Sequence, residues 1–167
     1  MSTQEPTFTE KQRFRQWWLW VLLSLGQGFF LWMLIQQVAL GIPFGSNPAP
    51  DFLVILLGLI FGCGPAIFMY LTGLDTIVTV QGILLRFHPF HRRWVTFSFE
   101  SIAEATALTY NPIRDYGGWG IRYGRKGKAY NVSGNQGVLL TLKDGRTVLI
   151  GSKNHTLLLS RIEANLD

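Results

Sequence analysis

The sequence predicts a membrane-anchored protein: an α-hairpin of two transmembrane helices, followed by a small antiparallel β barrel or sandwich with a C-terminal helix. Two apolar runs, each long enough to cross a bilayer, lie close together in the first half of the chain. The second half consists of short runs in which apolar and polar residues alternate, separated by turn residues. We therefore expect a cytoplasmic N-terminal segment at 1–16, a transmembrane hairpin at 17–72 and a cytoplasmic domain at 73–167.

The composition argues against a freely soluble enzyme. The 167 residues are 48% hydrophobic and only 15% charged, whereas ordinary soluble domains carry about 25% charged residues. The mean hydropathy is +0.22. High apolar content excludes a disordered chain, and a single cysteine, Cys63, excludes a disulfide-stapled scaffold.

The two apolar runs extend over about Trp17–Ile42 and Phe52–Thr72. Each reaches the roughly 20 residues that a helix needs to cross about 30 Å of hydrocarbon. The connection Pro43–Asp51 contains three prolines and one glycine, which favour a tight turn and prevent one continuous helix. The first run is too long for a cleaved signal peptide, and a second run follows it.

The basic residues predict how the hairpin is oriented. No lysine or arginine lies between Arg15 and Arg86, so the positive-inside rule predicts a multi-pass membrane protein with both termini in the cytoplasm. Trp17, Trp18 and Trp20 begin the first run, where amphipathic rings favour the headgroup layer. The basic tails also allow contact with anionic lipids, although topology signalling alone explains them.

Three residues inside the runs are candidates for helix packing. Gly58 and Gly62 are four residues apart and therefore share one helix face, where another backbone can approach closely. The approaching helix is either the other helix of the hairpin or a partner. Gln27 lies in the middle of the first run, and its amide should face protein because hydrocarbon offers no hydrogen bond. The runs contain no acid, base or histidine, which argues against a transporter or a haem protein.

The second half of the chain has the pattern of a strand series. Strands are expected at 75–80, 83–87, 93–99, 102–110, 119–123, 129–133, 138–142 and 147–150. Asp144-Gly145 between the last two predicts a type I′ hairpin turn. After Gly151 the apolar spacing becomes helical, and Asn154 is placed to cap that helix. We therefore expect an antiparallel barrel or an orthogonal sandwich, closed at one end by this helix.

Three stretches of this domain resemble a known group of proteins. They are GWGIR (118–122), YNVSGNQG (130–137) and the strand–Asp-Gly–strand segment 140–151. With the order of elements, they resemble the bacterial pleckstrin-homology-like domains attached to transmembrane hairpins, over about residues 73–166. The resemblance implies a membrane-tethered binding or assembly module, with no catalytic residues to carry over and no inherited lipid specificity.

Two short basic stretches are candidates for an interaction surface. Arg92 and Arg93 follow His88-Pro-Phe-His91; a metal site is disfavoured there because Pro89 makes the stretch a loop and no further ligand lies nearby. Arg125, Lys126 and Lys128 form the second stretch, which is too short for a nucleic-acid patch. Both stretches suit lipid phosphates or an acidic protein surface, and both are also ordinary compositions for solvated turns.

The sequence therefore favours a non-enzymatic accessory or scaffold subunit. Its helices would pack against other integral membrane proteins, for example in a respiratory or photosynthetic complex, and its cytoplasmic domain would brace them. No nucleophile-elbow spacing accompanies its serines and histidines, so we expect no catalytic residue, metal or cofactor. The alternative is a membrane-tethered module that senses a lipid or a peptide.

Overall fold

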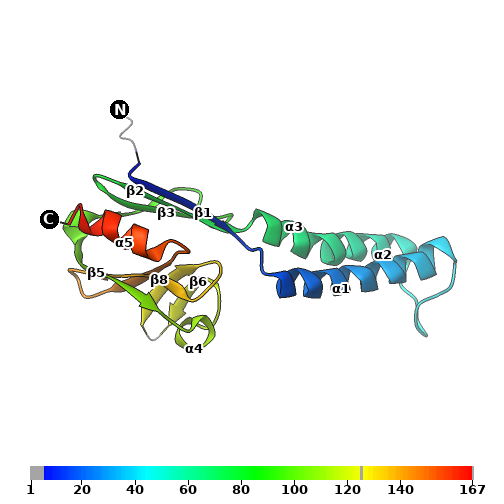
Figure 1. Ribbon diagram of the computed structural model, residues 1–167. Coiled ribbons are helices and arrows are strands. Elements are labelled where there is room, and N and C mark those ends of the chain that lie inside the picture. Colours follow the sequence, from blue (N-terminus) through cyan, green and yellow to red (C-terminus); the bar gives the residue numbers. More distant parts are fainter. Residues whose placement is uncertain (1–5, 125, 167) are drawn as a thin grey trace. The chain divides into compact units, whose positions relative to one another are not determined.

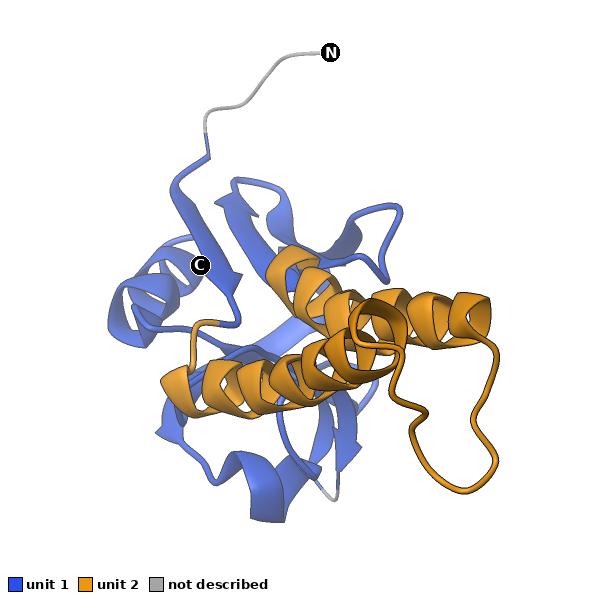
Figure 2. Cartoon of the chain, turned by 90° about the vertical axis from the view of Figure 1, so that its right-hand side faces the viewer, with its two compact units in different colours: residues 1–14, 72–167 blue, residues 15–71 orange. Residues whose placement is uncertain are grey.

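The computed structural model describes residues 6–124 and 126–166 (Figure 1). The chain forms two compact units, which Figure 2 shows in different colours. One unit contains residues 15–71 and is helical. The other combines the residues before Arg15 with those from Thr72 onward and holds the β-sheets. The β unit is therefore built from two separate stretches of the chain, with the helical unit inserted between them.

The helical unit contains two helices that are long and apolar enough to cross a membrane, at Trp17–Ala39 and Asp51–Leu71. The first consists of α1 (Trp17–Leu34) and a π-helical end, η1 (Ile35–Ala39). The second consists of α2 (Asp51–Leu57), a π-helical segment η2 (Gly58–Cys63) and α3 (Gly64–Leu71). The structure thus confirms two helices in the predicted runs.

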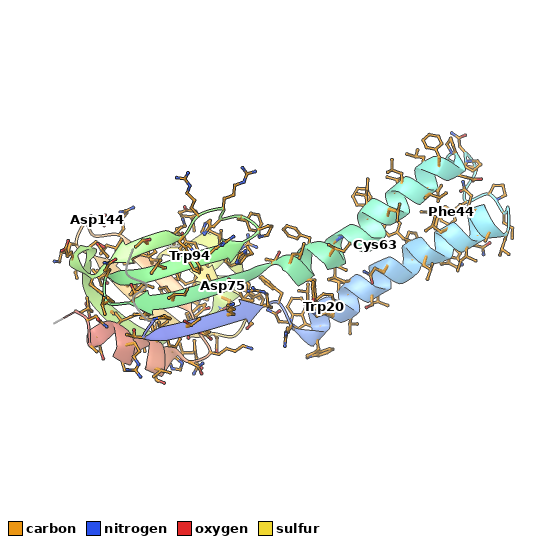
Figure 3. All side chains as sticks on the ribbon, turned by 90° about the horizontal axis from the view of Figure 1, so that it is seen from above. Trp20, Phe44, Cys63, Asp75, Trp94 and Asp144 are labelled. Atoms are coloured by element: carbon orange, nitrogen blue, oxygen red, sulfur yellow. The ribbon has the colours of Figure 1, made fainter. Side chains whose placement is uncertain are left out.

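The side chains of both helices are mostly exposed (Figure 3). In the most apolar stretch of the first helix no residue is buried, and in that of the second only 17% are. A core helix of a soluble protein buries its apolar stripe against neighbouring elements. These helices instead present apolar surface nearly all round.

Close packing of the two helices centres on two glycines of η2. A Cβ atom added at Gly58 would lie 2.9 Å from Cδ1 of Leu34, and one added at Gly62 would lie 3.3 Å from Cβ of Phe30. The ring of Phe30 also stacks on Phe61, with 6.3 Å between ring centroids. The glycines therefore face the other helix of the hairpin, where the missing side chains allow the backbones to approach.

The connection at the far end of the hairpin is held by Gln37, a buried residue of η1. Its amide donates hydrogen bonds to the carbonyl oxygen of Ala49 and, over 3.1 Å, to Oδ1 of Asp51. The ring of Phe44 (labelled in Figure 3) lies edge-on to Trp32, with 5.5 Å between centroids. Hydrogen bonds and aromatic contacts together close the hairpin.

In the β unit, the first sheet has four antiparallel strands in the order β1-β2-β3-β4. These strands are β1 (Phe8–Arg13), β2 (Gly73–Thr79), β3 (Gly82–His88) and β4 (Val95–Ser98). Along β3, the buried residues Ile83, Leu85 and Phe87 alternate with less buried ones, as expected for a sheet with one face on the core. β1 and β4 are its edges.

The second sheet has five strands in the order β5-β8-β9-β7-β6. They are β5 (Ile102–Thr109), β6 (Gly120–Gly124), β7 (Gly127–Asn131), β8 (Gln136–Leu142) and β9 (Thr147–Gly151). β7 and β9 pair in parallel, so this sheet is mixed. The prediction of purely antiparallel strands was therefore wrong. Over the described ranges the two sheets also form no closed barrel, because β4 and β6 remain unpaired edges.

Three short helices complete the unit: η3 (Phe99–Ser101), α4 (Pro112–Tyr116) and α5 (His155–Glu163). α5 packs against β5, β8 and β2, and so contacts both sheets. The main core consists of fully or almost fully buried side chains from both sheets and α5: Leu74, Val78, Ile83, Leu85, Phe87, Val138, Leu140, Val148, Ile150, Leu158 and Ile162. The predicted C-terminal helix is confirmed as part of this core.

The strand β1 was not predicted from the sequence. It pairs antiparallel with β2, and Arg13 lies opposite Gly73 in the register. A Cβ atom at Gly73 would collide with the carbonyl oxygen of Gln12 and the side chain of Arg13. Glycine is therefore needed where β2 begins, because the neighbouring strand passes too close for any side chain.

Polar side chains of β1 fix this strand to the segment before α5. The carboxylate of Glu10 is buried and accepts hydrogen bonds from the hydroxyl of Ser152 (2.5 Å) and the backbone N–H of Lys153 (2.9 Å). The amide of Gln12 donates to the carbonyl oxygen of Gly151 over 2.7 Å. These bonds join parts of the chain that are about 140 residues apart.

Two local predictions needed correction. Asn154 occupies the N-cap position of α5, but its side chain makes no capping hydrogen bond; Ser152 Oγ accepts from the Asn154 N–H instead (3.0 Å). The hairpin between β8 and β9 exists as predicted, but Asp144 does not adopt the positive φ of a type I′ turn; only Gly145 does, at φ 86°. Its N–H bonds to Leu142, which is typical of a type I turn followed by a left-handed residue.

We expect Glu10→Ala to destabilise the start of α5. The substitution leaves the buried Ser152 hydroxyl and the Lys153 N–H without their acceptor, which costs about 1–3 kcal/mol. Amide hydrogen exchange in α5 should become correspondingly faster. Thr9→Ala, on the exposed face of the same strand, is the matched control. Unchanged exchange in Glu10→Ala would contradict this account of β1.

We expect a disulfide to form between the helices in a Phe30→Cys, Gly62→Cys variant that also carries Cys63→Ser. The added Cβ at Gly62 lies 3.3 Å from Phe30 Cβ, near the ~3.5–4.5 Å of disulfides. After cleavage at a protease site engineered beside Gly45, the fragments should migrate together without reductant.

Adding Gly58→Leu should slow formation of this disulfide, because the new side chain meets Leu34. Gly64→Leu is the control, since a Cβ there has no neighbour within 4 Å. Equal rates in the two variants would contradict packing through Gly58.

Candidate functional site

The β unit has an open cleft of about 490 Å³ between the edge strand β4 and the β6–β7 hairpin. Most of its lining is apolar or aromatic, with a few polar groups at the side and rim. The lining residues are Val95, Phe97, Tyr123, Gly124, Gly127, Lys128, Tyr130, Leu142, Gly145, Arg146, Thr147 and Val148. Its volume and lining are typical of sites for small ligands.

The cleft exists because the two sheets do not join on this side. Val95 and Phe97 lie opposite Leu85 and Ile83 of β3, so they point to the same inward face as those buried residues. Both are only half-buried, since β4 is the last strand of its sheet. β6 is likewise the last strand of the second sheet. The inward faces of the two edges are therefore left partly uncovered.

Lys128 is the cationic group inside the cleft. It lies opposite Tyr123 in the β6–β7 register, and its Nζ is 5.1 Å from the ring centroid of Tyr123 and 4.8 Å from that of Tyr130. These are cation–π distances. In the described part of the chain no carboxylate forms an ion pair with Lys128. Burial lowers the pKa of Lys128, but interactions with Tyr130 and Tyr123 outweigh burial and raise it above its ordinary value.

His91 lies behind the cleft, with its ring edge-on to Tyr130 at 5.7 Å between centroids. Its Nδ1 accepts a hydrogen bond from the backbone N–H of Phe87 over 3.3 Å. Burial, and then the positive charge of Lys128, lower the pKa of His91. His91 is therefore uncharged near neutral pH, and Lys128 keeps its charge. At the rim, Arg146 is paired with Asp144 at 2.6 Å.

Glycines position the hairpin that carries Lys128. Cβ atoms at Gly124 and Gly127 would collide with the backbone of Asp115 and with Thr147, respectively, and Gly127 has φ 91°. The hydroxyl of Thr147 donates to the carbonyl oxygen of Lys126 over 2.8 Å. The hairpin is thereby held against β9 and α4, which fixes the backbone on either side of the cleft wall.

The motif GWGIR has a structural explanation around Asn131, a fully buried residue at the end of β7. The amide oxygen of Asn131 accepts from the N–H of Gly120 (2.9 Å), and its Nδ2 donates to the hydroxyl of Tyr110 (3.1 Å). Gly120 has φ 117°, a conformation that favours glycine. The motif therefore shapes the start of β6.

The two histidines of His88-Pro-Phe-His91 do not share a partner. His88 Nε2 lies 2.8 Å from Oδ2 of Asp75, and Arg13 donates to the other carboxylate oxygen over 2.8 Å. Asp75, labelled in Figure 3, lies on β2. Among the described residues, no group of three histidine, cysteine, aspartate or glutamate side chains could hold a metal ion.

The predicted basic surface is divided by the structure. Arg92 and Arg93 are exposed in the connection between β3 and β4. Lys126 lies 3.5 Å from Asp115, whereas Lys128 lines the cleft. Arg125 lies outside the described residues. Of the five predicted residues, only Lys128 is placed at a candidate ligand site among those described.

The predicted interfacial anchors begin α1. Trp17 and Trp18 are 77% and 44% exposed, and Trp20 is half-buried. Gln27 is half-buried near the middle of α1. Contact of these residues with lipid headgroups or with a partner helix remains a prediction.

The aromatic and apolar walls of the cleft were missed from the sequence. Val95 and Phe97 lie in the strand expected at 93–99, but nothing in the local pattern indicated that their face would stay open. Tyr123 could have been found from the β6–β7 pairing, which places it opposite Lys128. Tyr130 belongs to the same inward face through its partner Ile121.

Comparison with known proteins found no protein-family model and no curated protein that matches the chain. The resemblance to pleckstrin-homology-like domains therefore gains no support from these comparisons.

We expect the ion pair of Asp75 with Arg13, together with the hydrogen bond between Asp75 and His88, to stabilise the β unit at neutral pH. Burial raises the pKa of Asp75, but hydrogen bonds and charge interactions with Arg13 and His88 outweigh burial and hold it below the usual 3.8. The stabilisation is therefore complete above pH 3.8 and is lost as the pH falls below that value. Asp75→Asn should lower the free energy of unfolding by about 1–3 kcal/mol at pH 7.

Urea unfolding of the solubilised chain at several pH values measures this difference, which should shrink in acid. Asp144→Asn is the matched control, because its pair with Arg146 is exposed and surface pairs contribute little. A difference between wild type and Asp75→Asn that grows below pH 3.8 would contradict the assignment.

Proposed function

We propose that the chain is a non-enzymatic accessory or scaffold protein of a bacterial cytoplasmic membrane. In this proposal the two helices span the bilayer and pack against other integral membrane proteins. The β unit lies on the cytoplasmic side and braces the assembly. The observation that carries the proposal is the exposure of the two apolar helices, which lack internal cover along nearly their whole length.

The pairing of β1 with β2 supports a two-span topology. The helical unit is inserted in the sequence between these two strands, and Arg13 and Gly73 are opposite each other in the ladder. The hairpin therefore leaves and re-enters the β unit at neighbouring positions of one sheet. Two spans, unlike one or three, return the chain to the side from which it left.

Basic residues on the outer face of the first sheet support the cytoplasmic assignment. Lys11 of β1 and Arg86 of β3 lie on either side of the acidic Asp75 of β2, and Arg13 and His88 lie on either side of Gly73. Gly73 follows the second helix, which ends at Leu71. Positive charge beside the ends of membrane spans favours the cytoplasmic leaflet.

Cysteine labelling in intact cells tests the topology. In a Cys63→Ser background, Ser46→Cys in the helix connection should react with a membrane-impermeant maleimide. Glu163→Cys, exposed on α5, should react only after the cells are permeabilised. Recovery of the chain in the soluble fraction, or reaction of both cysteines in intact cells, would overturn the membrane assignment.

Gentle solubilisation from the native membrane tests the scaffold role. Other membrane proteins should co-purify with the chain in fixed stoichiometry. Purification of a monodisperse chain without such partners, from the membrane in which it is naturally expressed, would overturn the scaffold role while leaving the topology intact.

The open cleft between β4 and β6 favours a second candidate function, a membrane-tethered binding module. It combines an apolar lining with one cationic group that has no acidic partner in the described residues. Binding in the cleft does not require a partner protein, so this function can be tested separately from the scaffold role.

A further inference from the structure

The cleft contains a charge that nothing described within the chain neutralises. The ammonium group of Lys128 faces two tyrosine rings, and the surrounding walls include Val95, Phe97 and Val148. Placing an ammonium group among apolar groups costs free energy unless a counter-charge is supplied. The contacts with Tyr123 and Tyr130 stabilise the charged form of Lys128. An anion entering the cleft would add the direct counter-charge that the described residues do not provide.

We propose that this cleft binds a single-chain anionic lipid, with the negatively charged head at Lys128 and the apolar chain along the walls from β4 and β9. The proposal deepens the second candidate function and rests on it. It goes beyond the scaffold role and does not depend on any partner protein.

Charge and shape favour this class of ligand. A cationic head would be repelled by Lys128, and a strongly polar anion such as free phosphate would leave Val95 and Phe97 uncovered by apolar contact. Among the described residues that line the cleft, the other cation, Arg146, already has Asp144 as its partner, so one anionic head matches the one lining cation without an acidic partner. His91 is uncharged near neutral pH and adds no second positive group.

The cleft is open because two sheet edges border it, and this openness suits a chain-like ligand. Gly145 lines the cleft, and a Cβ atom there would have no neighbour within 4 Å, so a ligand can approach the backbone closely at this position. The phenol rings of Tyr123 and Tyr130 each present an apolar face beside Lys128. The cleft therefore offers a cationic group to the head of such a ligand and apolar faces to its chain.

Photo-crosslinking to the full chain in phosphatidylcholine nanodiscs tests the proposal. The probe is dodecanoate with a diazirine in its chain, and the labelled peptides are identified by mass spectrometry. We expect labelling of β4, β7 and β9 residues that line the cleft. Unlabelled dodecanoate and dodecyl phosphate should compete, whereas dodecanol and dodecyltrimethylammonium, which have the same chain, should not.

Variants of Lys128 test the contact with the anionic head. Lys128→Gln should reduce cleft labelling about tenfold or more, because a hydrogen bond between charged groups is lost; Lys128→Arg should retain it. Lys126→Gln is the matched control, since Lys126 pairs with Asp115 and does not line the cleft.

Val95→Asp should abolish labelling by placing a negative charge in the cleft without altering Lys128. Thr96→Asp, on the outward face of the same strand, should not. Amide exchange of β3 checks that both β4 variants retain the sheet.

Three results would overturn the proposal, and they are distinguishable. Equal competition by dodecanol would show a binding module that does not recognise the anionic head. Absence of cleft labelling by the diazirine dodecanoate would overturn both this proposal and the binding-module function for single-chain anionic lipids. Protection of the cleft by an acidic peptide, with no dodecyl probe bound, would assign a peptide strand at the edge of β4. None of these results would bear on the scaffold role, which co-purification tests.

Discussion

The antiparallel pairing of β1 with β2 is the constraint on which the organisation of the chain depends. It brings Arg13 opposite Gly73 and so closes a loop that contains the entire helical unit. Closing a long loop costs chain entropy, and the contacts of β1 must offset it. They include the backbone ladder and the buried hydrogen bonds of Glu10 to Ser152 and Lys153. β1 is thereby part of the same core as α5.

Local sequence patterns predicted much of this fold, because most of its elements have the periodicity of their own type. The two helices and the strands from β2 to β9 lie close to their predicted positions. β1 was missed because Glu10 and Gln12 occupy its inward positions, where a strand pattern requires apolar residues. Their burial is compensated by partners far away in the sequence, which periodicity does not reveal.

The site was less predictable than the fold, since it depends on which strands become neighbours. Parallel pairing of β7 with β9 makes β6 the outer strand, and this arrangement leaves the barrel open. Lys128 was recognised as basic, but its apolar surroundings come from β4, β6 and β9 together. Local patterns showed the composition of each strand and could not show that Tyr123 and Phe97 would line one cleft.

The two units differ in how far their side chains find hydrogen-bond partners or apolar cover within the unit. This difference indicates where a functional site is to be sought. In the β unit, the buried polar groups of Glu10, Asp75 and Asn131 each find partners within the unit. Such groups rigidify a fold but offer little to a ligand. Lys128 in the cleft and the apolar surface of the helices are accessible to a ligand or partner, and among the described residues Lys128 has no acidic partner and the helices have little internal cover. A charge without a counter-charge and apolar surface without cover both favour association, and they call for two chemically different partners.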